Sequence, residues 1–241
     1  MDIIVTNLVK SFKDNHVLRG LNLEIREGKI TVIIGGSGSG KSVLLKLLIG
    51  LLPPDAGAIL VNSQDITKLS ELALYPVRRQ FGMIFQTGGL LNSLTVGENV
   101  ALGLREHRMA PPEQIPQIIH EKLTLVNLAD KENEMPANLS GGMKKRVSIA
   151  RALTLNPRVI LYDEPTAGLD PPMAENIDSL ILNLNQQFGV TSVVVTHDMI
   201  SAFKLAHTVN MLHDGKIVAS GSPAEFRKSH EPIIHDFIKR K

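Results

Sequence analysis

Three apolar stretches with almost no polar alternation predict strands that are buried on both faces. They span residues 30–34, 159–162 and 190–196 and consist mainly of aliphatic and β-branched residues. A strand has this pattern when helices cover both faces of its sheet. A helical run follows the first stretch and ends near Gly50, and residues 175–188 predict another helix. This alternation of strands and helices predicts an α/β core with a parallel sheet.

Both ends of the chain contain shorter strand patterns. Residues 3–5 and 21–25 each predict a strand ahead of the first buried one. Within residues 209–219, Asp214 and Gly215 separate two apolar stretches and predict a hairpin, because this dipeptide favours a tight turn. A terminal helix is expected after the hairpin.

The middle of the chain has a different pattern. From Leu94 to about Leu155 helical segments dominate, and they are separated by prolines at positions 111, 112, 116 and 136. We therefore expect a single domain. Its core, residues 1–86 and 156–241, encloses a helical subdomain at residues 87–155.

Composition excludes several kinds of protein. The 241 residues are 43% hydrophobic and 21% charged, which is ordinary for a globular chain that buries a core. The absence of cysteine excludes a disulfide framework and a thiolate metal site. The N-terminus lacks the pattern of a signal peptide, and no apolar run reaches the roughly 18 residues that a membrane span requires. If the protein works at a membrane, we expect another chain to cross it.

The charge pattern argues against a nucleic-acid partner. The net charge is +2, whereas such partners favour a concentrated basic patch. Two basic runs, at residues 144–146 and 239–241, are expected to be a solvated face and a solvated tail.

A glycine-rich octet lies between the first buried strand and the helix that follows it. The octet consists of Gly35, Gly36, Ser37, Gly38, Ser39, Gly40, Lys41 and Ser42. In this context it matches the P-loop, in which glycines aim backbone N–H groups at phosphates and the helix N-terminus adds partial positive charge. Lys41 is suited to reach the β- and γ-phosphates, and the Ser42 hydroxyl is suited to bind Mg²⁺. The octet therefore predicts a nucleoside triphosphate site.

Two carboxylates, Asp163 and Glu164, end the stretch 159–162. The carboxyl ends of parallel strands share one edge, so both should lie near the P-loop. Asp163 is suited to hold Mg²⁺ through a water molecule, and Glu164 is suited to orient and deprotonate the attacking water.

A short motif between these two elements identifies a family. Leu139, Ser140, Gly141, Gly142 and Met143 resemble the signature motif of ATP-binding-cassette (ABC) ATPases. Ser140 should cap a helix whose first N–H groups form a second phosphate site. In the family this site meets the γ-phosphate held by the other subunit. The resemblance therefore implies a head-to-tail homodimer enclosing two MgATP, with a RecA-like P-loop core and N-terminal antiparallel strands.

Four further residues match motifs of the family in order. Phe12 matches the aromatic residue that stacks on adenine, and Gln86 looks like the Q-loop glutamine that senses Mg²⁺ and the attacking water. Asp170 ends a segment, residues 167–170, that looks like the D-loop of the dimer interface. His197 looks like the switch histidine that contacts the γ-phosphate.

Two positions depart from the family pattern. Met143 replaces the usual Gln of the signature motif, which removes the amide that would make a ribose contact there. Gly36 replaces a common Pro, so the loop loses stiffness but keeps its pattern.

Finer features resemble the ATPases of phospholipid-trafficking systems, the Mla-type or MCE-associated class. They lie at residues 81–91 and 104–107 and in the Met variant at residues 139–146. The resemblance implies an ATPase at the cytoplasmic face of the inner membrane, beneath transmembrane permease subunits. It also implies an MCE-type lipid-binding protein on the far side.

Parts of the sequence pattern also fit other kinds of protein. A transport ATPase for another cargo, such as amino acids or metal ions, would use the same machinery. A soluble ABC protein acting on DNA or ribosomes would need tandem cassettes, a long coiled-coil insertion or a basic arm, and the sequence contains none of these. A P-loop kinase or GTPase would lack the signature motif.

Overall fold

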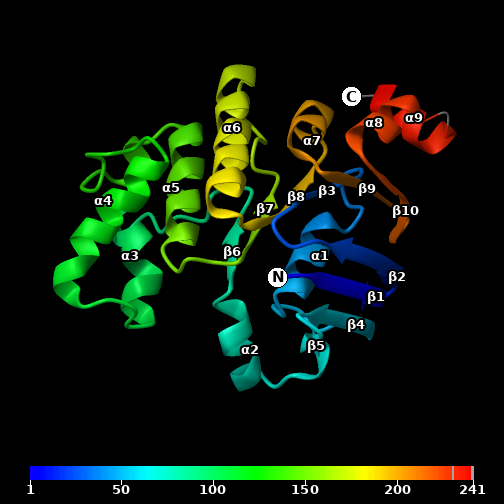
Figure 1. The fold of residues 1–241 in the computed structure, drawn as a ribbon, viewed down its shortest axis with the longest axis horizontal. Helices are drawn as coiled ribbons and strands as arrows, with labels where there is room; N and C mark the ends of the chain where they lie inside the picture. The colour runs from blue at the N-terminus through cyan, green and yellow to red at the C-terminus, as the bar shows by residue number, and fades with distance from the viewer. Residues whose placement is uncertain (230, 240–241) are drawn as a thin grey trace.

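A parallel sheet forms the centre of the computed structural model, which describes residues 1–229 and 231–239 (Figure 1). Its strands are β3 Ile30–Ile34, β6 Phe81–Ile84, β7 Val159–Asp163, β8 Thr191–Thr196, β9 Thr208–His213 and β10 Lys216–Gly221. Within the described residues the sheet is six-stranded, with the order β10-β9-β3-β8-β7-β6. All neighbours run parallel except β10, which pairs antiparallel with β9. The predicted parallel sheet and the Asp214–Gly215 hairpin are confirmed.

A second sheet is formed mostly by the N-terminal region. It contains β1 Ile3–Phe12, β2 Asn15–Ile25, β4 Ala56–Val61 and the two-residue β5 Gln64–Asp65, in the order β2-β1-β4-β5. All of its pairs are antiparallel. The two N-terminal strands are longer than the sequence pattern predicted, because alternating polar residues continue each strand along the exposed face of the sheet.

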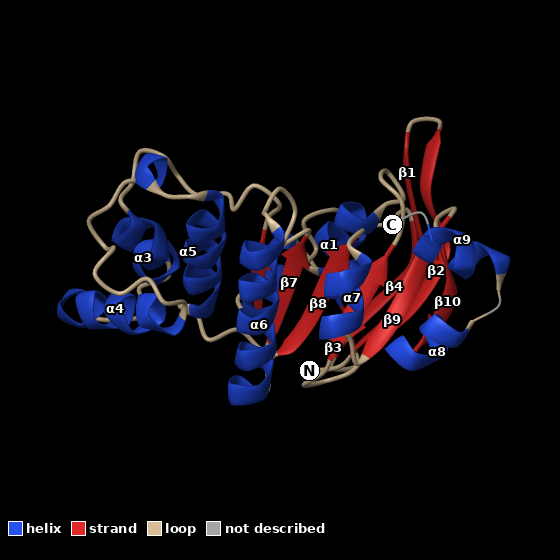
Figure 2. Cartoon of the chain, turned by 90° about the horizontal axis from the view of Figure 1, so that it is seen from above, coloured by secondary structure: helices blue, strands red, loops and turns tan. Residues whose placement is uncertain are grey.

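Some helices cover the parallel sheet, and others form a separate group at one end of the molecule. The helices of the described residues are α1 Lys41–Leu48, α2 Glu71–Arg78, α3 Val96–Glu106, α4 Ile115–Leu125, α5 Gly141–Leu153, α6 Pro171–Phe188, α7 Met199–Leu205, α8 Pro223–Lys228 and α9 Pro232–Lys239. In both views α3, α4 and α5 lie together to the left of the sheet (Figures 1 and 2). None of the helices in the described part of the chain combines the length and the apolar character needed to cross a membrane.

Prolines lie in the first turn of α4 and α6 and do not interrupt these helices. Pro116 was expected to interrupt the helical region, but it lies in the first turn of α4. Proline is tolerated there because the N–H groups of the first turn have no partner within the helix. Pro171 and Pro172 act similarly in α6, where the Asp170 side chain accepts a hydrogen bond from the Met173 N–H at 2.8 Å. This cap and the two prolines start α6 four residues earlier than the pattern predicted.

Alternate residues of the central strands belong to two separate apolar cores. One face of the sheet packs against α1 and the N-terminal sheet, with Ile33, Leu161, Val193, Val195 and Leu212. The opposite face, with Val32, Ile34, Ile160, Tyr162 and Val194, belongs to a core shared with helices α3 to α9. Figure 1 shows α1 between the two sheets and α6 and α7 on the other side. The strands read as continuously apolar because both faces are covered.

A buried acid lies between α6 and α7. Asp178 is 2% exposed, and the Ser201 hydroxyl lies 2.7 Å from its Oδ2. Its Oδ1 has no hydrogen-bond partner among the described residues. Burial is the main cause that raises the pKa of Asp178 to about 6; Asp198 and Glu175 add to this rise, whereas the Ser201 hydrogen bond and Lys204 oppose it. The folded protein therefore binds a proton here that the unfolded chain releases at lower pH.

We predict that Asp178→Asn removes a pH-dependent loss of stability. Between about pH 4 and pH 6 the folded state binds more protons at Asp178 than the unfolded state, so the free energy of unfolding falls as pH rises through this range. At about 1.4 kcal/mol per pKa unit, the variant should gain about 2 to 3 kcal/mol relative to wild type between pH 4 and pH 7. Urea titrations at both pH values measure this difference.

The matched control is Asp214→Asn, which changes the same chemical group in the exposed hairpin turn. A constant difference in unfolding free energy between Asp178→Asn and wild type at all pH values would contradict the prediction.

Candidate functional site

The glycine-rich loop connects β3 to α1 and is shaped by close backbone packing. A Cβ added at Gly35 would lie 2.6 Å from the Leu212 carbonyl oxygen and 2.8 Å from Ser39 Oγ, so a side chain does not fit there. Gly38 and Gly40 adopt φ values of +76° and +101°, which favour glycine. Gly40 is also the N-cap residue of α1 and offers no side chain to cap it. The first N–H groups of α1 are thus available to an anion.

Lys41 is buried beneath this loop and is held in place by the loop's own backbone. Its Nζ donates hydrogen bonds to the carbonyl oxygens of Gly35 at 2.9 Å and Gly36 at 3.1 Å. The same Nζ lies 3.5 Å from Glu164 Oε1. The residue is 7% exposed, so its positive charge is buried beneath the loop.

Ser42 and Asp163 bring two oxygens together at the start of α1. The Ser42 hydroxyl donates to Asp163 Oδ1 at 2.8 Å. Burial raises the pKa of Asp163; the Ser42 bond opposes this shift, and the charge of Glu164 adds to it. A hydroxyl next to a partly desolvated carboxylate is a donor set that suits Mg²⁺. Ser39 Oγ, buried in the same loop, has no partner among the described residues and fits a polar ligand.

The carboxylate of Glu164 joins two of these elements. Its Oε1 faces Lys41, and its Oε2 lies 2.9 Å from His197 Nδ1 and accepts the His197 backbone N–H at 3.2 Å. The carboxylate is buried, at 8% residue exposure, but it lines the pocket described next. Glu164 also adopts a φ of +48°, which is uncommon for a residue with a side chain.

A pocket of about 580 Å³ brings together most of the predicted site. It is lined by Phe12, Asn15, Val17, Ser37, Gly38, Ser39, Gly40, Lys41, Ser42, Val43, Gln86, Glu164 and His197. The predicted aromatic residue, phosphate loop, glutamine, carboxylate and histidine therefore share one cavity although they are far apart in sequence. Gly35, Gly36 and Asp163 are not part of this lining but accept hydrogen bonds from the lining residues Lys41 and Ser42.

The signature segment and Asp170 lie outside this pocket. Ser140 caps α5, and its Oγ accepts the Met143 N–H at 3.3 Å, as the sequence predicted. Gly141 and Gly142 form the first turn of α5, and Asp170 caps α6. Along the long axis of the molecule α6 lies between α5 and α1 (Figures 1 and 2). Within one chain the two predicted phosphate-binding elements are therefore separate.

Sequence reasoning missed one buried polar residue next to the site. Lys145 was expected to lie on a solvated basic face, but it is 5% exposed, and its Nζ donates to the backbone carbonyl oxygens of Gln86 and Glu164. Helical spacing could have indicated this, because Lys145 shares a helix face with the buried Ile149 and Leu153. Asn15, Val17 and Val43 were also missed as lining residues, and no motif in the sequence marks them.

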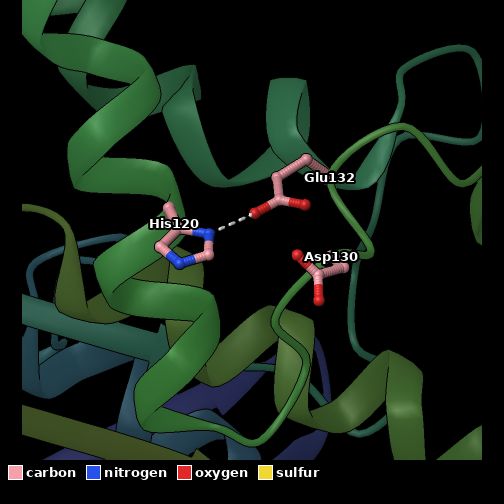
Figure 3. A group of neighbouring side chains, drawn as sticks. All are labelled: His120, Asp130 and Glu132. Atoms are coloured by element: carbon pink, nitrogen blue, oxygen red, sulfur yellow. Dashed lines mark hydrogen bonds and ion pairs between the residues drawn. The ribbon is translucent and has the colours of Figure 1, made fainter.

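One other group of potential metal ligands occurs in the described part of the chain. His120 of α4 lies beside Glu132 and Asp130, and its Nδ1 is 3.0 Å from Glu132 Oε1 (Figure 3). His120 and Asp130 are exposed, and the His120–Glu132 contact is an ordinary surface interaction. This group lies apart from the pocket, and we assign it no role.

The geometry suits one kind of chemistry. Backbone N–H groups and Lys41 can hold phosphates, and Ser42 with Asp163 can hold a divalent cation beside them. The Glu164 carboxylate lies at the same cavity and can accept a proton from a water molecule there. Such a set is suited to cleaving a phosphoanhydride by water.

Comparison with known proteins gives an independent result. The family model described as ABC transporter matches residues 18–167. The chain is also similar to a solved structure, the dimeric post-hydrolysis state of the ATP-binding cassette MJ0796 bound to ADP and Pi. The TM-score is 0.84 at 34% identity, covering 92% of this chain and 98% of that one.

Curated relatives with three different cargoes match to a similar degree. The intermembrane phospholipid transport system ATP-binding protein MlaF of Haemophilus influenzae is 41% identical, over 98% of this chain and 90% of its own length. The probable ribonucleotide transport ATP-binding protein mkl of Mycobacterium leprae is 40% identical, over 98% of this chain and 68% of its length. The methionine import ATP-binding protein MetN of Vibrio vulnificus is 43% identical, over 94% of this chain and 66% of its length.

We predict that Gly35→Ala lowers both stability and nucleotide affinity. The added Cβ would collide with the Leu212 backbone, so the loop must shift. Such overpacking costs about 1 to 3 kcal/mol of unfolding free energy. The shifted N–H groups should weaken ATP binding at least tenfold, equivalent to about 1.4 kcal/mol. Denaturant titration and ATP titration measure the two effects.

Gly36→Ala is the matched comparison, because a Cβ at that position has no neighbour within 4 Å. A markedly smaller loss is expected for this variant. Equal losses in the two variants would show that the close packing at Gly35 does not shape the site.

Proposed function

Because the chain belongs to the ABC transporter family and is an ATP-hydrolysing cassette, we propose that it energises phospholipid transport between membranes through a partner permease. The observation that best supports hydrolysis is the position of the Glu164 carboxylate between Lys41 and His197 at the pocket. Support for the phospholipid cargo comes from MlaF, which the chain matches over 90% of that protein's length.

The proposed nucleotide site extends along the whole pocket, from Phe12 to the glycine-rich loop. Phe12, 43% exposed at the pocket's edge, would stack on adenine. The N–H groups of residues 35–42 would bind the phosphates, and Lys41 would turn from the loop carbonyls toward the β- and γ-phosphates. A lysine held by two neutral carbonyls can make this exchange because a phosphate oxygen is a stronger acceptor.

Three residues are proposed to hold Mg²⁺. Ser42 would bind through its hydroxyl, Asp163 through a water molecule and Gln86 through its side-chain oxygen. When bound there, Mg²⁺ would neutralise charge on the β- and γ-phosphates. The Ser42–Asp163 hydrogen bond keeps the two oxygens together, so little rearrangement is needed.

Glu164 is proposed to accept the proton of the attacking water. His197, hydrogen-bonded to the same carboxylate, would orient it and contact the γ-phosphate. Burial of Glu164 keeps bulk water away from all but the pocket side of the carboxylate. The role of Lys41 in this arrangement is electrostatic, since its ammonium lies 3.5 Å from Glu164 Oε1.

The signature segment is proposed to complete the site of a second copy. Ser140, Gly141 and Gly142 lie outside the chain's own pocket, and the solved relative MJ0796 is dimeric. A head-to-tail homodimer would bring these residues over the partner's ATP and would place Asp170 near the interface. In this proposal residues 87–155 act as a helical subdomain that turns against the core formed by residues 1–86 and 156–241.

The proposed setting is the cytoplasmic face of the inner membrane, where the dimer would bind transmembrane permease subunits. An MCE-type lipid-binding protein is the expected further component, and no nucleic acid is involved. The main alternative is another cargo, such as amino acids or metal ions, and the similarity to the methionine import protein MetN supports this alternative.

We predict that Glu164→Gln retains ATP binding and loses hydrolysis. The amide has nearly the same shape as the carboxylate but cannot accept the proton of the water. General-base catalysis contributes about 10² to 10⁴-fold to the rate, so kcat should fall by that factor. Phosphate-release assays and ATP titrations measure rate and affinity separately.

Lys41→Ala serves as the contrasting variant, because it removes a phosphate ligand and should weaken ATP binding itself. Hydrolysis by Glu164→Gln at the wild-type rate would show that another group is the base. Unchanged affinity in Lys41→Ala would count against its contact with the phosphates.

The cargo is tested by purifying tagged Glu164→Gln from native membranes in mild detergent. Slowed hydrolysis should keep the assembled complex together. We expect a multi-span permease, an MCE-type protein and phospholipid to co-purify, and mass spectrometry identifies each. Recovery of a different permease without lipid would retain the ATPase mechanism and overturn the phospholipid cargo.

A further inference from the structure

The Lys145 ammonium links the signature helix to two residues of the proposed catalytic site. Its Nζ donates to the backbone carbonyl oxygen of Gln86 and, at 3.2 Å, to that of Glu164. The residue is 5% exposed, and a buried cation is stable only where hydrogen bonds replace its water shell. No carboxylate of the described residues forms an ion pair with it, so these two carbonyls hold the charge.

Lys145 belongs to a row of donors along one side of α5. Three residues at intervals of three, Lys145, Ser148 and Arg151, lie on adjacent turns of the helix. Ser148 Oγ lies 2.5 Å from the Gly88 carbonyl oxygen, and Arg151 Nη1 donates to that of Gly89 at 2.7 Å. The row therefore donates hydrogen bonds to the backbone carbonyl oxygens of three of the four residues in the loop at residues 86–89. Lys145 differs from the other two because it also reaches Glu164.

Glu164 needs such support because its backbone is in an unfavourable conformation. A non-glycine residue at a φ of +48° persists only where its surroundings hold it. The Glu164 N–H donates to the Val195 carbonyl oxygen at 2.9 Å, and its own carbonyl oxygen accepts the Ala167 N–H at 3.2 Å. The ammonium of Lys145 is the side-chain donor to that carbonyl. It therefore helps to fix the direction in which the Glu164 side chain leaves the backbone.

We propose that Lys145 is a positioning residue, which fixes the backbone of both Glu164 and Gln86 and makes the signature helix move together with them. This inference rests on the proposed function of that site. A displacement of α5 would therefore move the backbones of Glu164 and Gln86 through the Lys145 side chain.

The test compares Lys145→Met with Lys145→Arg and with Lys144→Met in the full chain. Methionine keeps the apolar length of lysine but has no donor, and arginine keeps both charge and donors. Lys144 is the half-exposed neighbour on the same helix. We expect Lys145→Met to lower kcat at least about tenfold, since small misplacements of reacting groups can cost up to about a hundredfold. ATP affinity should change by less than about threefold, Lys145→Arg should recover part of kcat, and Lys144→Met should match wild type.

Hydrogen exchange followed by mass spectrometry gives a second measure that does not depend on hydrolysis. Lys145→Met should exchange faster than wild type at residues 86–89 and 164–167, and Lys144→Met should not. Wild-type kcat and wild-type exchange in Lys145→Met would overturn the proposal, as would an equal loss of kcat and ATP affinity. If instead Glu164→Gln hydrolyses ATP normally, the base assignment fails while the exchange rates still decide whether Lys145 fixes the two backbones.

Discussion

The position of the Glu164 carboxylate between Lys41 and His197 is the contact on which the proposed nucleotide pocket depends. The three residues follow three different strands: Lys41 follows β3, Glu164 follows β7 and His197 follows β8. These strands are neighbours in the order β3-β8-β7 and run parallel, so their carboxyl ends meet at one edge. Reversing any one strand would carry its residue to the opposite edge. The parallel sheet is therefore a requirement of the chemistry, and the two cores on its faces make that sheet stable.

Much of this arrangement could be predicted from the sequence because its causes are local. The strands at residues 30–34 and 159–163 have no polar alternation, which indicates burial on both faces. The octet at residues 35–42 directly follows the first of these strands, and the pair Asp163–Glu164 lies at the end of the second, so a parallel sheet suffices to bring them together. Ser140 is followed by a helical run, which made its role as an N-cap predictable. The family resemblance supplied Phe12, Gln86 and His197, which the residues alone would not have identified.

Other features could not be predicted because they depend on contacts distant in sequence. Lys145 lies in a basic run that suggested solvent exposure, and its burial is decided by the loop at residues 86–89, about 60 positions earlier. The left-handed backbone of Glu164 is likewise imposed by its neighbours, because glutamate has no intrinsic preference for it. Ser140 and Asp170 lie outside the pocket, and no periodicity in one chain can show what a second chain would bring to them.

One side of α5 stabilises the fold through apolar packing, and the adjacent side positions the loop at residues 86–89 through hydrogen bonds. Val147 and Ile149 are fully buried in the apolar core, where contacts are strong in sum but tolerate small sliding movements. The donors on the adjacent side meet backbone carbonyl oxygens of residues 86, 88, 89 and 164, and such bonds weaken steeply when distance or angle changes. The apolar side therefore keeps α5 attached to the core while the polar side fixes its register against the loop at residues 86–89. Under the proposal that α5 moves as a unit with this loop, both kinds of contact are needed, because apolar packing alone would let the loop lag behind.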